Sequence, residues 1–119
     1  MPSKTRVVFL NALPLNAIPY NSFTIACWRV GFDVLRIHVV DSVVESYIRH
    51  EATLRLVSSV LGVDLKPSSG LYSYRPGDAL AVVTLKKPAR GQEVAEVKPE
   101  DLDVHLCLVS RGNGGGGAG

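Results

Sequence analysis

The residues best suited to chemistry lie where an extended segment meets a helical one. The β-branched run at residues 39–48 is followed by Arg49 and His50, and a helical pattern starts at Glu51. The first N–H groups of a helix are unpaired and partly positive, so a helix start attracts anions such as phosphate. A histidine there either contacts the bound anion or simply faces solvent. The junction therefore predicts a site for nucleotide or nucleic-acid chemistry.

Two further groups of polar residues follow predicted strands. One is the cationic stretch before Gly91, which consists of Lys86, Lys87 and Arg90. The other is the pair of asparagines in a proline-restrained loop, Asn11 and Asn16. Loops at strand ends commonly carry binding residues, although lysines there also keep a loop solvated and asparagines also form turns. The other histidines, His38 and His105, are too scattered to predict a metal site.

Strand-like patterns outnumber helical ones in the regions that must position these residues. Strands are predicted at residues 5–10, 23–30, 43–48 and 103–110. The strongest helix is predicted at residues 51–61, where apolar residues recur at helical spacing and Gly62 supplies a stop. Residues 32–40 fit a short helix or a strand. A hairpin is predicted at Pro76-Gly77-Asp78, which lies between the strand-like segments 71–75 and 79–87. Residues 97–102 fit one helical turn.

Length and composition predict one small α/β domain. The chain has 119 residues, of which 46% are hydrophobic, and a net charge of only +2. We expect a single domain at residues 1–111, with a mixed β-sheet and helices packed mainly on one face. The glycine-rich stretch at residues 112–119 predicts a disordered tail. No apolar run approaches the ~20 residues of a membrane span and no secretory signal is visible, so a cytoplasmic protein is expected.

The two cysteines, Cys27 and Cys107, lie far apart, each inside a strand-like run. We expect buried free thiols, because unpaired cysteine behaves as a small apolar residue. A disulfide or a metal site remains the alternative.

Several pieces of the sequence resemble one family of small proteins. They are Phe9-Leu10-Asn11-Ala12 with Asn16, His50-Glu51-Ala52-Thr53 through Leu61-Gly62, Asp78-Ala79-Leu80 with the strand to Lys87, and Gly91. Together they resemble the archaeal-virus and prokaryotic family that includes the type III anti-CRISPR ring nucleases. The resemblance spans residues 5–110, and the segment around His50 is its most specific part.

The resemblance implies a homodimer that cleaves cyclic tetra-adenylate, the second messenger of type III CRISPR defence, without a metal or other cofactor. In that family the catalytic histidine falls on His50. A ribose 2′-OH attacks the adjacent phosphorus, and the histidine acts as general acid on the departing 5′-oxygen. We expect five further residues to contact the ligand: Asn11, Arg49, Thr53, Lys87 and Arg90.

The chain also departs from the family pattern. Arg49 stands where members commonly have glycine, and Arg90 replaces a glutamate that assists catalysis in the viral enzymes. Ser69 and Lys87 fall where those enzymes have arginine, and Ala52 where they often have serine. Two alternatives to a ring nuclease follow. One is a dimeric regulatory protein that binds duplex DNA, and the other is a sponge that binds the cyclic nucleotide without cutting it.

Overall fold

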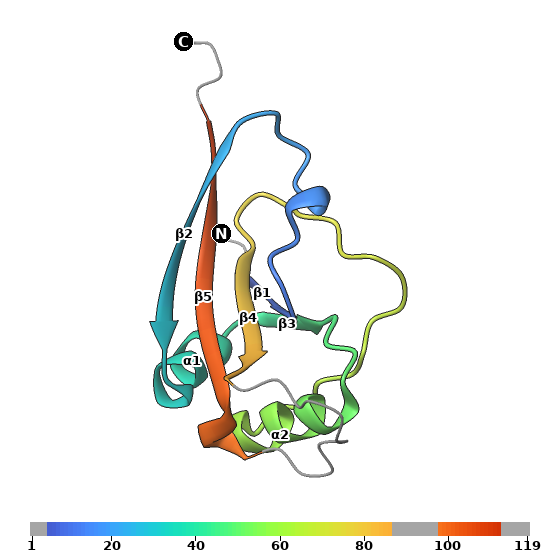
Figure 1. Ribbon diagram of the computed structural model, residues 1–119, viewed down its shortest axis with the longest axis vertical. Helices are drawn as coiled ribbons and strands as arrows, with labels where there is room; N and C mark the ends of the chain where they lie inside the picture. The colour runs from blue at the N-terminus through green and yellow to red at the C-terminus, as the bar shows by residue number, and fades with distance from the viewer. Residues whose placement is uncertain (1–4, 87–97, 113–119) are drawn as a thin grey trace.

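A five-stranded mixed sheet forms the centre of the computed structural model, which describes residues 5–86 and 98–112 (Figure 1). The strand order is β2-β5-β4-β1-β3, and β1 pairs in parallel with both β3 and β4, whereas β5 is antiparallel to β4 and β2. The elements in chain order are β1 Arg6–Leu10, the 3₁₀ turn η1 Leu15–Ala17, β2 Phe23–Val30, α1 Phe32–Val39, β3 Val43–Ser46, α2 Glu51–Leu61, β4 Ala79–Leu85, the 3₁₀ turn η2 Pro99–Asp101 and β5 Leu102–Arg111.

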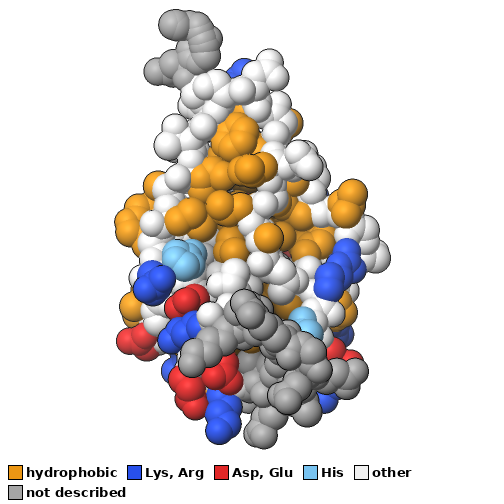
Figure 2. Space-filling view, viewed as in Figure 1, with side chains coloured by type: hydrophobic (Ala, Val, Ile, Leu, Met, Phe, Trp, Pro, Cys, Tyr) orange, Lys and Arg blue, Asp and Glu red, His pale blue; other side chains and the backbone are white. Residues whose placement is uncertain are grey.

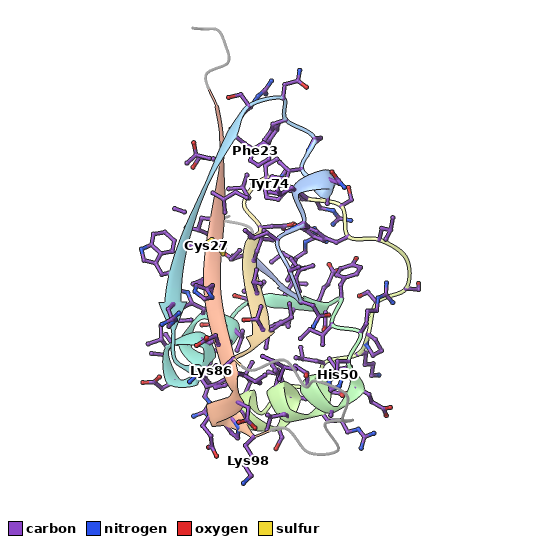
Figure 3. The ribbon with its side chains drawn as sticks, viewed as in Figure 1. Phe23, Cys27, His50, Tyr74, Lys86 and Lys98 are labelled. Atoms are coloured by element: carbon purple, nitrogen blue, oxygen red, sulfur yellow. A yellow bond between two sulfur atoms is a disulfide. The ribbon has the colours of Figure 1, made fainter. Side chains whose placement is uncertain are left out.

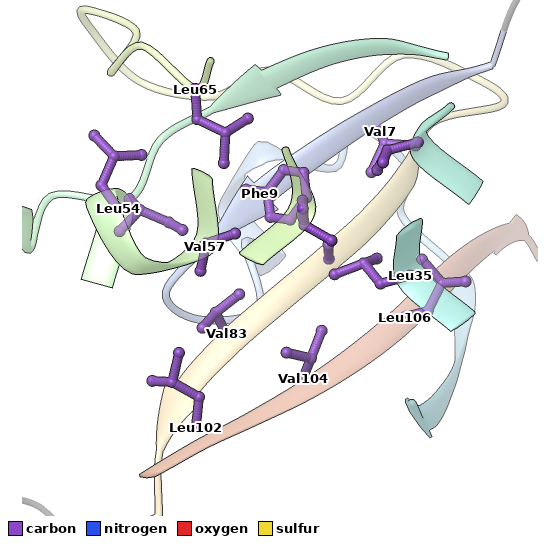
Figure 4. Packing of buried hydrophobic residues seen from close by; sticks show 14 of the residues in the cluster. Val7, Phe9, Leu35, Leu54, Val57, Leu65, Val83, Leu102, Val104 and Leu106 are labelled. Carbon is purple, nitrogen blue, oxygen red and sulfur yellow. The ribbon is translucent and has the colours of Figure 1, made fainter. Parts of the chain in front are cut away.

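Both α-helices pack on the same face of the sheet, as predicted. Alternate residues of β1, β4 and β5 point to this face, because successive side chains of a strand point to opposite sides. Phe9, Val83 and Val104 from the sheet meet Leu35 of α1 and Val57 of α2 in one buried cluster (Figure 4). The chain is therefore an α/β domain whose helices cover one face of a mixed sheet.

The opposite face of the sheet is covered by loops. Val8, Leu80 and Cys107 form its buried floor, and Tyr72 and Tyr74 from the segment before β4 lie against it. Tyrosine suits such a cover because its ring packs on the apolar floor while its hydroxyl reaches polar partners. This second cluster fixes the loops that border the candidate site.

Helix α2 has the bounds that the sequence predicts because its signals are local. Leu54, Val57 and Leu61 recur at helical spacing and are buried. Gly62 ends the helix with φ of +70°, a left-handed conformation that favours glycine. Helix α1 resolves the ambiguity at residues 32–40, since Leu35 and Val39, four residues apart, are the two positions that it buries.

The predicted hairpin at Pro76-Gly77-Asp78 is wrong. Both neighbours of β4 are already taken, by β1 and β5, so the sheet has no place for residues 71–75 beside it. That segment instead crosses the loop-covered face, where the N–H of Tyr74 donates to the carbonyl of Ala17 at 3.1 Å. The alternating pattern at residues 71–75 reflects Tyr72 and Tyr74 packing on the sheet.

The prediction of buried free thiols is also wrong. Cys27 of β2 lies directly opposite Cys107 of β5, and the two form a disulfide with a Cα–Cα distance of 4.1 Å. Cys107 is buried, but Cys27 is exposed because β2 is the outer strand of the sheet. Eighty residues separate the two cysteines, so their pairing depends on strand order and register.

The remaining sequence predictions have mixed outcomes. The turn expected at residues 97–102 is η2. Most of the glycine-rich tail lies outside the described residues, but the N–H of Gly112 donates to the carbonyl of Ser22 at 2.7 Å. In the described part of the chain, no helix is long and apolar enough to cross a membrane.

Candidate functional site

The candidate site lies at the end of the sheet where β1, β3 and β4 finish. These three neighbouring strands are parallel, so their carboxyl ends lie along the same edge. Ligands of open α/β sheets commonly bind beyond the carboxyl ends of parallel strands. Figure 3 shows His50 at the start of α2 and Lys86 just after β4, at this same end of the molecule.

Asn11 and Arg49 are joined directly across this edge. Asn11 follows the last residue of β1, and Arg49 lies in the short connection between β3 and α2. The backbone N–H of Arg49 donates to Oδ1 of Asn11 at 3.0 Å. Two residues earlier in both segments, the N–H of Tyr47 donates to the carbonyl of Phe9 at 2.8 Å. The bonds fix the start of α2 relative to the end of β1.

His50 is the N-cap of α2, and its ring makes the capping contact. The N–H of Thr53 donates to Nδ1 of His50 at 3.3 Å, and Oγ1 of Thr53 lies 2.9 Å from the same nitrogen. When Nδ1 accepts the Thr53 N–H, the proton of a neutral imidazole is on Nε2. Thr53 itself is buried, so its hydroxyl serves His50 and holds the ring.

Two cavities open on either side of this junction. The smaller one, of about 330 Å³, is lined by His50 and Asn11 together with Thr53, Val83, Thr84, Leu85 and Leu102. The larger one, of about 630 Å³, is lined by Arg49 and Asn16 together with Leu10, Leu13, Pro14, Leu15, Ala17, Tyr47, Gly70, Leu71 and Tyr72. Both volumes are within the range of small-molecule sites, and adjacent residues of the chain reach one cavity each.

The guanidinium of Arg49 is already engaged within the protein. Its two terminal nitrogens donate to the carbonyls of Ser68 and Gly70, at 3.4 and 2.6 Å. Arg49 therefore ties the loop after α2 to the start of that helix, and it forms part of the wall of the larger cavity. Its side chain stays exposed and keeps its charge at the rim.

A polar network behind the larger cavity was missed by sequence reasoning. Tyr72 donates its hydroxyl proton to Asp78, and Arg6 holds the same carboxylate with two bonds, Nε to Oδ1 at 2.8 Å and Nη2 to Oδ2 at 2.5 Å. Arg6 also pairs with Glu45 at 2.8 Å. The network fixes Tyr72, whose ring lies 5.5 Å from that of Tyr47 in the cavity wall.

Charge in this network is stabilised by its hydrogen bonds. Burial opposes ionisation of Asp78, but bonds from Arg6 and Tyr72 outweigh it and hold the pKa of the carboxyl below its ordinary value. Burial and the bond to Asp78 raise the pKa of Tyr72. The sequence did contain a signal for this pair. Arg6 is the first residue of β1, Asp78 directly precedes the neighbouring strand β4, and the two side chains have opposite charges.

The structure brings together four of the six site residues that the sequence predicts. Asn11, His50 and Thr53 line one cavity, and Arg49 lines the adjacent one. Lys87 and Arg90 lie outside the described residues, although Leu85, at the end of the strand that leads to them, lines the His50 cavity. Among the residues that the structure describes, no three His, Cys, Asp or Glu side chains cluster as metal ligands.

Comparison with known proteins shows to which family the chain belongs. The profile of the STIV B116-like family matches residues 7–107. Among solved structures, B116 of Sulfolobus turreted icosahedral virus superposes with a TM-score of 0.65 at 17% identity, covering 86% of this chain and 97% of that one. No curated protein matches. The resemblance to archaeal-virus proteins is confirmed at the level of family and fold, because the chain belongs to the STIV B116-like family.

Proposed function

We propose that the protein is a metal-independent ring nuclease that binds a cyclic oligoadenylate, cyclic tetra-adenylate in the first instance, and cleaves it with His50 as general acid. One observation carries this proposal. The ring of His50 is held at the start of α2 by Thr53 through Nδ1 and lines a cavity that it shares with Asn11. A histidine held through one ring nitrogen has the other available for proton transfer.

In the proposed reaction the substrate supplies the nucleophile and the protein supplies the proton donor. The ribose 2′-oxygen forms a bond to phosphorus and loses its proton to solvent, while the bond from phosphorus to the 5′-oxygen breaks. Protonated His50 gives its Nε2 proton to that leaving oxygen. The products are a 2′,3′-cyclic phosphate and a free 5′-hydroxyl. The nucleophile belongs to the substrate, so the protein supplies orientation, a proton and electrostatic stabilisation.

Thr53 fits the role of a positioning residue in this scheme. In the protonated ring Nδ1 carries a hydrogen and no longer accepts the N–H of Thr53. Oγ1 of Thr53, 2.9 Å away, accepts that hydrogen instead. After Nε2 has given up its proton, the same bond holds the neutral ring. The hydroxyl therefore holds His50 both before and after Nε2 gives up its proton. The sequence predicted Thr53 only as a residue that contacts the ligand.

The surroundings of His50 suit an anionic nucleotide. The first N–H groups of α2, at Glu51 and Ala52, face the end of the helix where an anion is favoured. Arg49 adds a cation at the rim, and Lys87 and Arg90 are proposed as further phosphate contacts. The larger cavity, with Tyr47, Tyr72 and several leucines, offers apolar and aromatic walls of the kind on which bases pack.

A homodimer belongs to the same proposal. A ring of four identical nucleotides has two-fold symmetry, and a two-fold dimer would present two equivalent His50 residues to one ring. The sponge is the second candidate, and the observation that favours it is Arg90 in the position of a family glutamate that assists catalysis.

The test is incubation of the purified protein with radiolabelled cyclic tetra-adenylate in EDTA, followed by chromatography against product standards. We expect linear products with 2′,3′-cyclic phosphate ends from wild type and from His38→Ala, which removes an exposed histidine on α1. From His50→Asn we expect the same products about 10²- to 10⁴-fold more slowly. Tight binding with no product from wild type would establish the sponge. Tighter binding of duplex DNA than of the ring at near-physiological salt would establish the DNA-binding alternative.

A further inference from the structure

The outer edge of β2 is unusually well suited to pairing with another strand. β2 ends the strand order, so no described strand lies beside that edge (Figure 1). It runs for eight residues without proline, glycine or a bulge, in continuous register with β5. Natural edge strands are normally short, charged, bulged or covered, because a regular edge is a template for another chain. The opposite edge, β3, has only four residues and carries Glu45.

The backbone groups on this edge can be identified. Cys27 and Cys107 are only 4.1 Å apart between Cα atoms, which is typical of opposed residues that do not exchange ladder hydrogen bonds. The N–H and C=O groups of Cys27 therefore point away from β5. The same holds for alternate residues along the strand, namely Phe23, Ile25 and Arg29. Each presents to the outside a donor and an acceptor that no described strand pairs.

The side chains on the edge are mostly apolar and exposed. Trp28 is 50% exposed, and Leu108 of β5, diagonal to it, is 43% exposed. Ala26 and Cys27 are exposed as well. Arg29 is the one charged residue of the strand, and Asp103 lies 3.6 Å from it. The edge therefore carries almost no repulsive charge. Figure 2 shows hydrophobic side chains gathered over the upper and middle parts of the face in view, with most of the charged ones below them.

We propose that β2 pairs antiparallel with β2 of a second copy, about a two-fold axis at Ala26, to make one continuous ten-stranded sheet. In this register Ile25 lies opposite the partner's Cys27 and Phe23 opposite the partner's Arg29. All four outward-facing residues then exchange both of their hydrogen bonds with the partner. A register shifted by two residues leaves either Phe23 or Arg29, depending on the direction of the shift, opposite a residue outside the strand, which is why Ala26 is assigned to the axis.

A second copy fits this edge better than an unrelated strand because the sequence of β2 complements itself. Trp28 lies opposite the small Thr24 of the partner on the helix-covered side, next to the central pair of alanines, so each indole has room over small residues. On the other side, the guanidinium of Arg29 meets the ring of the partner's Phe23, a favourable cation–π arrangement. A two-fold contact of this kind is closed and stops at two copies.

This contact is separate from the shared cleft of the proposed nuclease. His50 follows β3, which lies at the far end of the sheet from β2. Across ten strands spaced by about 4.8 Å, the two outermost strands are about 40 Å apart, so β2 pairing cannot bring two His50 residues to one ring. If the nuclease dimer also forms, the two contacts close into a tetramer only when their two-fold axes intersect at right angles, and otherwise they link copies into an open chain. The inference therefore stands or falls independently of the proposed function.

Substitutions at Ala26 test the axis. Opposed residues at such a position are about 4.5 Å apart, so Ala26→Lys and Ala26→Glu each place two like charges face to face. We expect the mass measured by light scattering to be half that of wild type for each variant. A one-to-one mixture of the two should recover the wild-type mass, because lysine then faces glutamate. Ile37→Lys, which alters an apolar residue of α1 that is 75% exposed, is the control and should keep the wild-type mass.

Trp28 gives an independent readout because it is the only tryptophan. On dilution of wild type we expect its emission to shift to the red and its quenching by iodide to increase, over the range where the mass halves. Circular dichroism and thermal unfolding check that the variants are folded. An unchanged mass in folded Ala26→Lys and Ala26→Glu, or a mixture that stays at half mass, would overturn the proposal. So would a mass of Ala26→Lys that grows without limit as concentration rises, because growth would then not depend on the β2 contact.

Discussion

Oδ1 of Asn11 accepts a hydrogen bond from the backbone N–H of Arg49 at 3.0 Å, although 38 residues separate them in the chain. The bond joins the end of β1 to the residue before the helix cap. It therefore sets the position of His50 against the loop that borders both cavities. The placement of Arg49 and of His50, which follows it, therefore depends on this one amide.

Asn11→Ala should loosen the start of α2. Loss of a single hydrogen bond of this type lowers the free energy of unfolding by about 0.5–1.5 kcal/mol, which urea titration would detect. We also expect slower ring cleavage, because His50 loses its fixed position. Asn21→Ala, which removes an exposed asparagine before β2, should change neither quantity. Equal cleavage rates in both variants would remove Asn11 from the site.

His50 has a structural role and a proposed catalytic role, and two substitutions separate them. His50→Ala removes the N-cap, which costs about 1 kcal/mol, together with the general acid. His50→Asn keeps an oxygen that caps the helix but cannot protonate a leaving group. Both should reduce the single-turnover rate by about 10²- to 10⁴-fold, whereas only His50→Ala should lower the melting temperature. Ligand affinity should change little in His50→Asn. Full activity in that variant would exclude His50 as the acid.

Thr53→Val tests whether the hydroxyl positions the imidazole. The variant keeps the shape of the buried side chain and the backbone N–H that caps the helix, but it loses Oγ1. We expect the single-turnover rate to fall by roughly 10- to 100-fold with unchanged ring affinity, because a small misplacement of a catalytic group is costly. Thr53→Ser should restore the rate. A weaker affinity with an unchanged rate would instead show Thr53 to be a ligand contact.

Acid should weaken the fold through Asp78. Its pKa is lowered in the folded protein relative to the usual value near 4, so ionised Asp78 stabilises the fold at neutral pH. That contribution is lost as pH falls below about 4 towards the folded pKa. Asp78→Asn should lower the free energy of unfolding at neutral pH by about 1.5–3 kcal/mol and should flatten its dependence on acid pH. Asp41→Asn, at an exposed aspartate, should leave both unchanged.

The fold and the site differ in how far the sequence could reveal them. The bounds of β2 and α2 matched their predictions because side-chain periodicity, a cap and a glycine stop are local signals. His50 and Asn11 were also identifiable, since His50 directly precedes a predicted helix and Asn11 directly follows a predicted strand. Their convergence followed from the parallel pairing of β1 and β3, which local patterns did not contain.

The failures have one physical origin. The supposed hairpin before β4 and the supposed free thiols were read from local residue types, whereas both depend on which strands are neighbours. β5 occupies the place beside β4 that a hairpin would need, and it also places Cys107 against Cys27. The bond from Tyr72 to Asp78 and the larger cavity likewise arise only when distant segments meet on the sheet.

The place of β5 in the sheet has a consequence for synthesis of the protein. β5 follows the other described strands in the chain, yet it lies between β2 and β4 and is the element that connects them. Until the ribosome has released residues 102–111, β2 has no partner strand and one edge of β4 is open. The nascent chain therefore carries unpaired apolar strand edges until β5 has been made, and the five-stranded sheet is completed only in that step. Long-range pairing of this kind slows folding and prolongs the period in which the chain can aggregate.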